Sequence, residues 1–186
     1  DFSLGVTRDH HRRGIDPLAG AGKLGPLLAQ FPASFRDTPM SRAHLASLLR
    51  AFHGYQMAVE LRHRSWSDRA QDTRHLLDAF GAAWAWIDEP KFSASVRQEE
   101  TPPGPFLYAR LHGRNAKAWW RSSNNERYDY LYSAEELEPI GQRIKGQRGF
   151  LYTNNHPNAR AVANAPADTG NRQPGRAGSC RRLRCS

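Results

Sequence analysis

Short apolar runs rich in β-forming residues alternate along the chain with longer segments in which apolar residues recur at helical spacing. This alternation is typical of βα units arranged around a parallel sheet. Six apolar runs have the length of strands, so the pattern predicts an α/β fold. They lie at Phe2–Val6, Pro26–Phe31, Met57–Leu61, Trp84–Ile87, Phe106–Leu111 and Phe150–Tyr152.

Two segments between these runs have an apolar stripe and a recognisable boundary. The first is predicted to form a helix over residues 41–52, with its apolar positions spaced along one face. Those positions are Leu45, Leu48, Leu49 and Phe52. The second helix is predicted to begin at Ser67 as its N-cap and to stop at Gly81, with Ala70, Thr73, Leu77 and Phe80 on one face.

Ser133 and Glu136 have the spacing of a capping box and predict the start of a third helix. In such a box each side chain accepts a hydrogen bond from the other residue's backbone N–H. Pro139 lies inside this helix, where proline removes a backbone hydrogen bond and costs about 3 kcal/mol if nothing compensates. We therefore expect a helix with a possible kink near Pro139.

Two stretches do not fit a compact βα unit. Residues 9–22 are polar and glycine-rich without helical period, so one crossover helix is expected to be missing or very short. Residues 117–132 form a polar segment with five aromatic side chains, and a loop of that length after a strand is more often functional than a short connector. The segment fits a lid over a site or a surface on which a ring or base stacks.

Charge is concentrated at the end of the chain. The 186 residues carry a formal charge of +9, and residues 166–186 alone hold five arginines against one aspartate. We therefore divide the chain into a domain at residues 1–165 and a disordered basic tail at 166–186. Because so much of the excess lies in the tail, the charge gives weak support for nucleic-acid binding.

Cys180 and Cys185 are the two cysteines, and their spacing without partner histidines matches no zinc pattern. No apolar run approaches the roughly 18 residues that a membrane span needs. The N-terminal residues lack the charged-then-apolar pattern of a secretory signal. A cytoplasmic location without a membrane partner is the default expectation.

The strands end in polar residues, and in parallel α/β folds ligands bind beyond the carboxyl ends of the strands. We assign Glu60, Asp88 and His112 as candidate catalytic residues. The candidate ligand-binding residues are Gln30, Arg62, His63, Trp66, Arg110, Arg114, Asn154, Asn155 and His156. Since side chains alternate along a strand, Arg110 and His112 are expected to point to the same side, toward a barrel mouth.

Three interpretations of this polar set stay open. Arg62, Arg110 and Arg114 form a cationic floor for a phosphate or carboxylate, with His112 and His156 transferring protons. Alternatively, Glu60 forms a structural ion pair with Arg62 or Arg110. A third interpretation places a divalent metal among Glu60, Asp88, His112 and His156, but three nearby arginines would oppose a cation, so no metal is assigned.

Several enzyme classes lack their sequence signals. Ser34 and Ser65 lie outside any G-x-S-x-G turn, which weakens the case for a serine nucleophile. Neither a Gly-x-Gly-x-x-Gly motif nor a P-loop is present, which argues against a dinucleotide enzyme and an NTPase. No cofactor is assigned, and the sequence does not give the oligomeric state.

Five motifs in order, GPLLAQFPASF, VELRHRSW, YARLHGR, YSAEEL and TNNHPNARAVANA, resemble the YecE-like family known as domain of unknown function 72. The match spans roughly residues 24–165. The resemblance implies a TIM-type (β/α) barrel whose polar cluster includes Gln30, Glu60, Arg62, His63, Trp66, Asp88, Arg110, His112, Asn154 and Asn155. It implies no reaction, because the family is named for lacking one.

The chain also departs from the family. Two further strands with an EINSTFY-like segment would precede Phe2, so six of eight barrel strands are expected. A lysine-bearing run after Phe2 and an apolar final helix after Ala165 are also missing. We therefore consider three functions: a barrel that binds a small anion, with hydrolase or lyase chemistry; a nucleic-acid-binding module; and an inactive truncated or frameshifted fragment.

Overall fold

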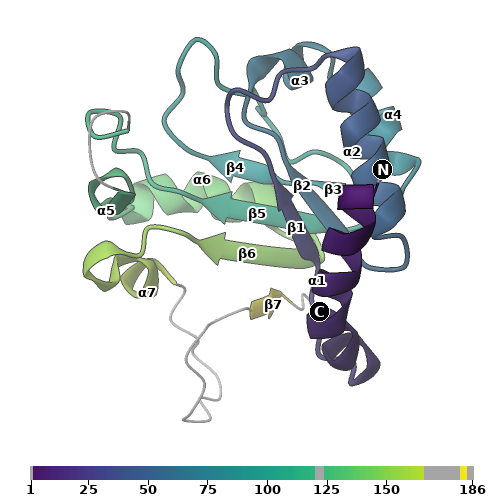
Figure 1. The fold of residues 1–186 in the computed structure, drawn as a ribbon. Helices are drawn as coiled ribbons and strands as arrows, with labels where there is room; N and C mark the ends of the chain where they lie inside the picture. The colour runs from purple at the N-terminus through teal and green to yellow at the C-terminus, as the bar shows by residue number, and fades with distance from the viewer. Residues whose placement is uncertain (1, 120–123, 166–180, 184–186) are drawn as a thin grey trace. The chain divides into compact units, whose positions relative to one another are not determined.

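The computed structural model of the protein describes residues 2–119, 124–165 and 181–183. Its strands form two sheets, with the orders β1-β2-β3 and β4-β5-β6-β7 (Figure 1). All neighbouring strands are parallel except β6 and β7. The α/β class predicted from the sequence is confirmed. Neither sheet closes into a barrel within the described part of the chain.

The chain divides into two compact units, residues 1–84 with 94–97, and residues 85–93 with 98–186. The elements of the first unit are α1 (Phe2–Gly20), β1 (Leu27–Gln30), α2 (Pro39–Ala51), β2 (Met57–Glu60), α3 (Arg64–Asp68), α4 (Ala70–Asp78) and β3 (Ala83–Trp84). Strand β2 is buried along its whole length, whereas β1 lies at the edge of the sheet and is half-buried. The predicted stripe of α2 is confirmed, since Leu45 and Leu49 are its buried residues.

The elements of the second unit are β4 (Trp86–Asp88), β5 (Leu107–Leu111), α5 (Asn124–Arg127), α6 (Ala134–Ile144), β6 (Gly149–Thr153), the 3₁₀ turn η1 (Pro157–Ala159), α7 (Arg160–Asn164) and β7 (Arg181–Leu183). Strand β5 lies between β4 and β6. Because these three strands are parallel, their carboxyl ends share one edge of the sheet.

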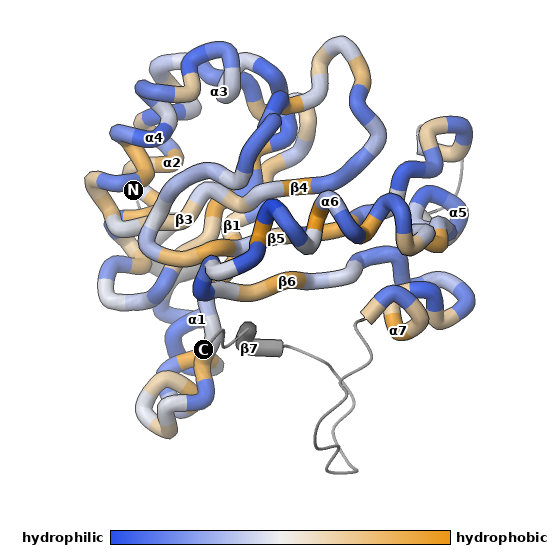
Figure 2. The backbone as a smooth tube through the Cα atoms, turned by 180° about the vertical axis from the view of Figure 1, so that it is seen from behind, coloured by the Kyte–Doolittle hydropathy of each residue, from blue (hydrophilic) through white to orange (hydrophobic). Residues whose placement is uncertain are grey.

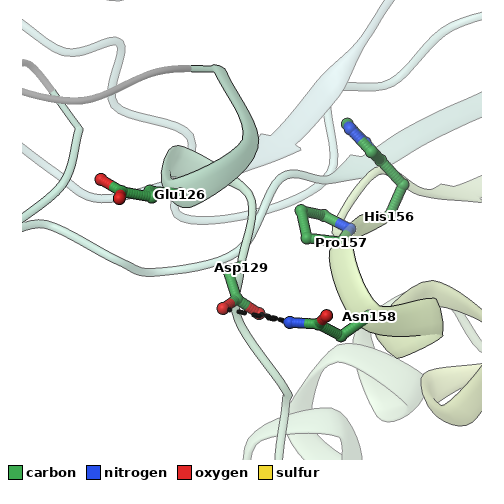
Figure 3. A pocket seen from close by; sticks show the side chains of 5 residues that line it. All are labelled: Glu126, Asp129, His156, Pro157 and Asn158. Atoms are coloured by element: carbon green, nitrogen blue, oxygen red, sulfur yellow. Dashed lines mark hydrogen bonds between the residues drawn. The ribbon is translucent and has the colours of Figure 1, made fainter.

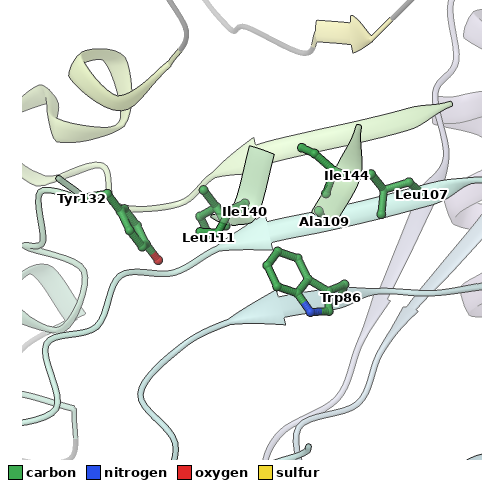
Figure 4. Packing of buried hydrophobic residues seen from close by; sticks show 7 residues of the cluster. All are labelled: Trp86, Leu107, Ala109, Leu111, Tyr132, Ile140 and Ile144. Atoms are coloured by element: carbon green, nitrogen blue, oxygen red, sulfur yellow. The ribbon is translucent and has the colours of Figure 1, made fainter. Parts of the chain in front are cut away.

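One face of this second sheet is covered by α6 (Figure 4). The helix alternates between apolar and polar positions in Figure 2, as an amphipathic helix does. Its apolar side packs on alternate residues of the central strand. The cluster consists of Trp86, Leu107, Ala109, Leu111, Tyr132, Ile140 and Ile144.

The predicted capping box at the start of α6 is confirmed. The Ser133 side chain accepts from the Glu136 backbone N–H, and the Glu136 carboxylate accepts from the Ser133 backbone N–H. Pro139 lies within the helix, which nevertheless continues to Ile144. The two buried isoleucines that follow the proline supply packing that offsets its missing hydrogen bond.

The prediction for the N-terminal segment was wrong. The predicted strand Phe2–Val6 and the polar stretch after it belong to one helix, α1. This helix has no apolar stripe because most of its described side chains face solvent. The Tyr55 hydroxyl donates to the Asp16 carboxylate and accepts from Arg12 Nε, and the His11 ring lies 6.4 Å from the Phe52 ring. Over residues 9–20, where the side chains are described and mostly exposed, the helix shows no 3.6-residue apolar period in the sequence.

The N-cap predicted at Ser67 was also wrong. Residue 67 lies inside the short helix α3, whose N-cap is His63, and α4 begins only at Ala70. The Ser67 hydroxyl is used differently, because it donates to the Arg64 carbonyl and accepts from the Arg97 backbone N–H. The predicted stop at Gly81 agrees with its positive φ of 61°.

The strand predicted at Trp84–Ile87 is interrupted at Ala85, where β3 ends and β4 begins. The side chain of Gln98 explains the start of β4. Its amide donates to the Ala85 carbonyl and accepts from the Ile87 backbone N–H, so it occupies groups that a neighbouring strand would use.

Other predictions fall partly outside the described residues. In the aromatic segment 117–132 the structure has a short helix, α5, but Trp120 lies outside the described part. Most of the tail and both cysteines also lie outside it, while residues 181–183 form β7 beside β6. Among the described residues, no helix is both long and apolar enough to span a bilayer.

Gly149 gives a test of the pairing between β5 and β6. It pairs with Leu107, and a Cβ at this glycine would overlap the Leu107 carbonyl oxygen and lie 2.6 Å from the Leu107 Cβ. Gly149→Ala is expected to lower the free energy of unfolding by about 1–3 kcal/mol, because the strands must move apart. Urea unfolding measures the change.

Gly141→Ala is the matched control. Gly141 lies in α6, and a Cβ there would meet nothing within 4 Å. Alanine should stabilise this helix by roughly 0.5–1 kcal/mol relative to glycine. Equal effects of the two substitutions would contradict the close approach of β5 and β6.

Candidate functional site

At the carboxyl end of β2 a carboxylate and a guanidinium are paired. Glu60 is fully buried, and Arg62 Nε donates to its Oε1 at 2.7 Å. Gln30 pairs with Glu60 across the parallel strands and is exposed at the sheet edge. Of the interpretations drawn from the sequence, the ion pair between Glu60 and Arg62 is confirmed. A charged carboxylate that is removed from water requires such a partner.

Trp66 belongs to the packing beside this strand end. Its ring is fully buried and stacks on Phe35 at 5.5 Å between centroids, while its indole N–H donates to the Phe35 carbonyl at 2.8 Å. The guanidinium of Arg42 lies 5.5 Å from the Trp66 ring. With these contacts Trp66 positions the loop after β1, and its N–H is already used.

Asp37 lies in that loop and was missed by the sequence analysis. Its side chain is 1% exposed and takes two hydrogen bonds from Arg42, from Nε at 2.6 Å and Nη2 at 2.7 Å. These bonds raise the pKa of Arg42 above its ordinary value. An aspartate and an arginine five residues apart around a helix start give no recognised local signal, so the pair could not be found from spacing.

In the second unit Asp88 is the centre of a polar network at the carboxyl end of β4. Arg114 binds it with two hydrogen bonds of 2.9 Å, and the Tyr132 hydroxyl donates to it at 2.7 Å. The same hydroxyl accepts from the Gly113 backbone N–H at 2.9 Å. Asp88 is therefore held by three donors, as a structural carboxylate is.

Glu136 extends this network from the N-terminus of α6. Its Oε1 accepts from Arg114 Nη1 at 3.2 Å and from the Tyr130 hydroxyl. We call Asp88, Arg114, Tyr130, Tyr132 and Glu136 the carboxylate network. It fixes Tyr130 and Tyr132 of the aromatic segment against the sheet edge.

Protonation in the carboxylate network follows from burial and charge. The hydrogen bonds to Asp88 raise the pKa of Arg114, and burial together with the charge of Asp88 raises that of Tyr132. Burial and the hydrogen bond to Glu136 raise the pKa of Tyr130 to about 12. Burial opposes ionisation of Glu136, but the bonds from Tyr130 and Ser133 and the charge of Arg114 lower its pKa overall.

Arg110 and His112 lie on the other face of the same sheet. Asp88 pairs with Leu111, whose side chain packs against α6, whereas Arg110 pairs with Ile87 and Tyr152. Because side chains alternate, Arg110 and His112 point away from α6. That Arg110 and His112 share a side stays a prediction, whereas Asp88, in register with Leu111, points to the side of α6.

His112 is fully buried beside an aromatic stack. Its ring centroid lies 6.0 Å from that of Tyr128, which in turn lies 5.5 Å from His156 and 6.1 Å from Trp119. Trp119 is itself 4% exposed and has the guanidinium of Arg127 over its ring. Trp119 is therefore covered by its neighbours, whereas Tyr128 is half-buried.

Two asparagines that follow β6, Asn155 and Asn164, connect this end of the chain to the backbone at Tyr130 and Tyr132. Asn155 Nδ2 donates to the Tyr130 carbonyl and to Asn164 Oδ1, at 2.8 Å and 2.7 Å. Asn164 closes a ring with the Tyr132 backbone, accepting from its N–H at 3.0 Å and donating to its carbonyl at 2.8 Å. We call Asn155 and Asn164 the asparagine clamp. Asn155 thus positions the segment around Tyr130 and Tyr132, and Asn164 was missed from the sequence.

An open cavity of about 330 Å³ lies beside this segment (Figure 3). Its lining residues are Glu126, Asp129, His156, Pro157 and Asn158. His156 is exposed, with its Nδ1 3.1 Å from the Asn154 carbonyl, and Asn154 continues the β-ladder through its backbone N–H to Leu111. Asp129 already binds Asn158 and Arg160.

The sequence-derived site residues are therefore distributed over the two units. Gln30, Glu60, Arg62, His63 and Trp66 belong to the first unit, and Asp88, Arg110, His112, Arg114, Asn154, Asn155 and His156 to the second. Within each unit they lie at the carboxyl ends of neighbouring strands. In the described ranges, no three or more His, Cys, Asp or Glu side chains are grouped to hold a metal ion.

Tyr132→Phe tests the carboxylate network. Removal of the hydroxyl leaves Asp88 without one donor and the Gly113 N–H without its acceptor, both in a buried place. The expected loss of unfolding free energy is about 1–3 kcal/mol, measured by chemical denaturation. Tyr128→Phe, whose ring makes contacts but whose hydroxyl has no hydrogen bond to a described residue, should change it by less than about 0.5 kcal/mol. Similar losses would contradict the network.

The lowered pKa of Glu136 predicts how stability depends on pH. A carboxylate whose pKa falls on folding adds stability above its ordinary pKa of 4.5, and this contribution disappears as the pH falls through the lowered value. Glu136→Gln should therefore be less stable than the parent protein at pH 7, and the difference should shrink by pH 3. Glu138→Gln, exposed on the same helix, serves as the control in thermal unfolding across this range.

Comparisons place the chain among known proteins. The family model described as protein of unknown function DUF72 matches residues 6–169. A crystal structure of a DUF72 family protein from Thermotoga maritima is 33% identical, with a TM-score of 0.74 over 84% of this chain. A DUF72 family protein from Enterococcus faecalis is 23% identical, with a TM-score of 0.77 over 86% of this chain.

This chain spans 60% of the length of the Thermotoga protein and 62% of the Enterococcus protein. No curated protein matches it significantly. Since the family model covers most of the 186 residues, the chain belongs to the DUF72 family, whose function is unknown.

Proposed function

We propose that this protein binds a small anionic ligand, bearing a phosphate or carboxylate group, at the carboxyl ends of its parallel strands. The observation that carries the proposal is the position of Arg110. It lies on β5, the central strand of the β4-β5-β6 group, on the face opposite α6, and its side chain is half-buried. A guanidinium offers a planar fork of donors that matches a carboxylate or phosphate.

Arg114 is a secondary partner in this proposal, and Arg62 has the corresponding place at the carboxyl end of β2 in the first unit. Each already binds a carboxylate, Arg62 through Nε to Glu60 and Arg114 through three nitrogens to Asp88 and Glu136. Arg110 is set apart from these two by its place on the central strand, not by its bonding.

Any hydrolase or lyase reaction at this site would draw first on His112. It lies two residues beyond Arg110 on the same face, and imidazole exchanges protons near neutral pH. Glu60 and Asp88 are less suited to act as bases, because each is buried and bound to an arginine. Gln30, Asn154 and His156 would contribute polar contacts at the strand ends.

We also propose that the two sheets are parts of one incomplete (β/α) barrel. Support comes from the strand order, which follows the chain in both sheets, and from the single residue between β3 and β4. In a barrel the face opposite the helices is the interior. Arg110 would then lie near the mouth where barrel ligands bind.

Ligand-dependent thermal unfolding tests the anion site. Inorganic phosphate, pyrophosphate and citrate are titrated against the protein at constant ionic strength. At about 100 times its Kd, a ligand adds about 2.7 kcal/mol of stability, which corresponds to roughly 5–10 °C in Tm. We expect Arg110→Gln to abolish this shift.

Arg148→Gln is the matched control. Arg148 is exposed and immediately precedes β6, at the amino end of the sheet, so its removal should leave the shift intact. Equal loss in both variants would indicate a general charge effect. A folded parent protein that responds to none of the three anions would overturn the proposal.

A further inference from the structure

Ser65 and His63 are in hydrogen-bonding contact at the carboxyl end of β2. The Ser65 Oγ lies 2.9 Å from His63 Nδ1, within the range expected for a nucleophile and its base. Both side chains are half-buried. Sequence motifs gave no indication of this pair, because the serine is not on a G-x-S-x-G turn.

The direction of this hydrogen bond follows from the surrounding donors. The Ser65 backbone N–H donates to His63 Nδ1 at 3.1 Å, so Nδ1 carries the lone pair and the ring proton is on Nε2. The Asp37 backbone N–H donates to Ser65 Oγ at 2.8 Å. Since a backbone N–H only donates, the serine hydroxyl proton is left to point at His63 Nδ1.

The pair is held by the packing around it. Asp37, which presents the N–H, is fixed by two bonds from Arg42, and Trp66 next to Ser65 is fully buried. The backbone on both sides of His63 pairs with the segment 94–97, through Arg64 N–H to Ala94 O and Val96 N–H to Arg62 O. The hydroxyl and the imidazole are thus oriented before any ligand arrives, as catalysis requires.

We propose that Ser65 is a nucleophile and His63 its general base, in the hydrolysis of a carboxylic ester. Oγ forms a bond to the acyl carbon while its proton moves to Nδ1. The bond to the alkoxy oxygen then breaks, and that oxygen takes the proton from Nδ1 and leaves as the alcohol. Water gives a proton to Nδ1 and attacks the acyl-serine, the acid departs, and the proton returns to Oγ.

The charges around His63 agree with this role. Burial lowers its pKa below the ordinary value of 6.5, and the positive charges of Arg36 and Arg64 lower it further, against the smaller opposing effect of Asp68. The imidazole is therefore neutral at pH 7 and able to accept a proton. The positive charges of Arg36 and Arg64 favour an ester that carries a negative group elsewhere, and this preference does not depend on Arg110.

An uncharged fluorophosphonate tests the nucleophile on the unmodified protein. Attack by Oγ on phosphorus expels fluoride and leaves a stable phosphonyl-serine. Trypsin releases Ser65–Arg69 as the peptide SWSDR, and fragment masses distinguish Ser65 from Ser67. We expect the label on Ser65 in the folded protein and none after heat denaturation. Ser67 is the internal control, since its hydroxyl donates to a carbonyl and has no imidazole.

Two variants and a pH series separate catalysis from helix capping. His63→Gln should slow labelling at least about 100-fold, the usual contribution of a general base, whereas Ser67→Ala should leave the rate unchanged. The rate should fall with acidification only below pH 6.5, the ordinary pKa of histidine. If the contacts serve only to cap α3, Ser65 of the folded parent protein stays unlabelled, which would overturn the proposal.

Failure here is distinguishable from failure of the anion site. The probe has no charge, so its reaction does not require Arg110, and the thermal shifts with phosphate do not require Ser65. Labelling of Ser65 without any anion-induced shift would leave an esterase and overturn only the anion site at Arg110. An anion-induced shift without labelling would leave a binding protein whose Ser65 is structural.

Discussion

Burying a carboxylate requires a partner that replaces its water, and this requirement shapes both units of the protein. Asp37, Glu60 and Asp88 follow or end strands β1, β2 and β4, and each accepts from an arginine at 2.6–2.9 Å. Breaking such a pair leaves an uncompensated charge and typically costs 3–5 kcal/mol. The arginines bound to these carboxylates therefore stabilise the fold, and any contact that they make with a ligand is additional to this role.

The alternation of side chains along β5 places the apolar core residues on one face of the sheet and the candidate ligand-binding residues on the other. Leu107, Ala109 and Leu111 face α6 and build the apolar core, and the carboxylate network lies at the end of that same side. Arg110 and His112 face the other way. One strand thus contributes residues of opposite character to two faces.

Much of the fold follows from local patterns. The stripe at Leu45 and Leu49, the capping box at Ser133 and five of the six predicted strand regions have counterparts in the structure. Helix α1 gave no signal over residues 9–20, because most of the described side chains there are exposed and have no apolar period. The break at Ala85 depends on Gln98, a residue thirteen positions away, which no local rule connects to it.

The site was less predictable than the fold for the same reason. The positions at strand ends predicted Glu60, Arg62 and Asp88 as site residues. The cost of burying a charge predicted that such residues form ion pairs. Asp37, Asn164 and the contact between Ser65 and His63 arise from residues brought together by folding. Alternation also could not show that Asp88 and Arg110 lie on opposite faces until the register of β4 against β5 was known.

The asparagine clamp has a consequence for motion. Asn155 and Asn164 connect the loop after β6, helix α7 and the backbone at Tyr130 and Tyr132 through four hydrogen bonds. None of these segments can open without losing bonds to the others, so they should exchange their amide hydrogens as one cooperative unit. The residues that line the cavity beside His156 are then expected to open and close together with α7, and not as an independent loop.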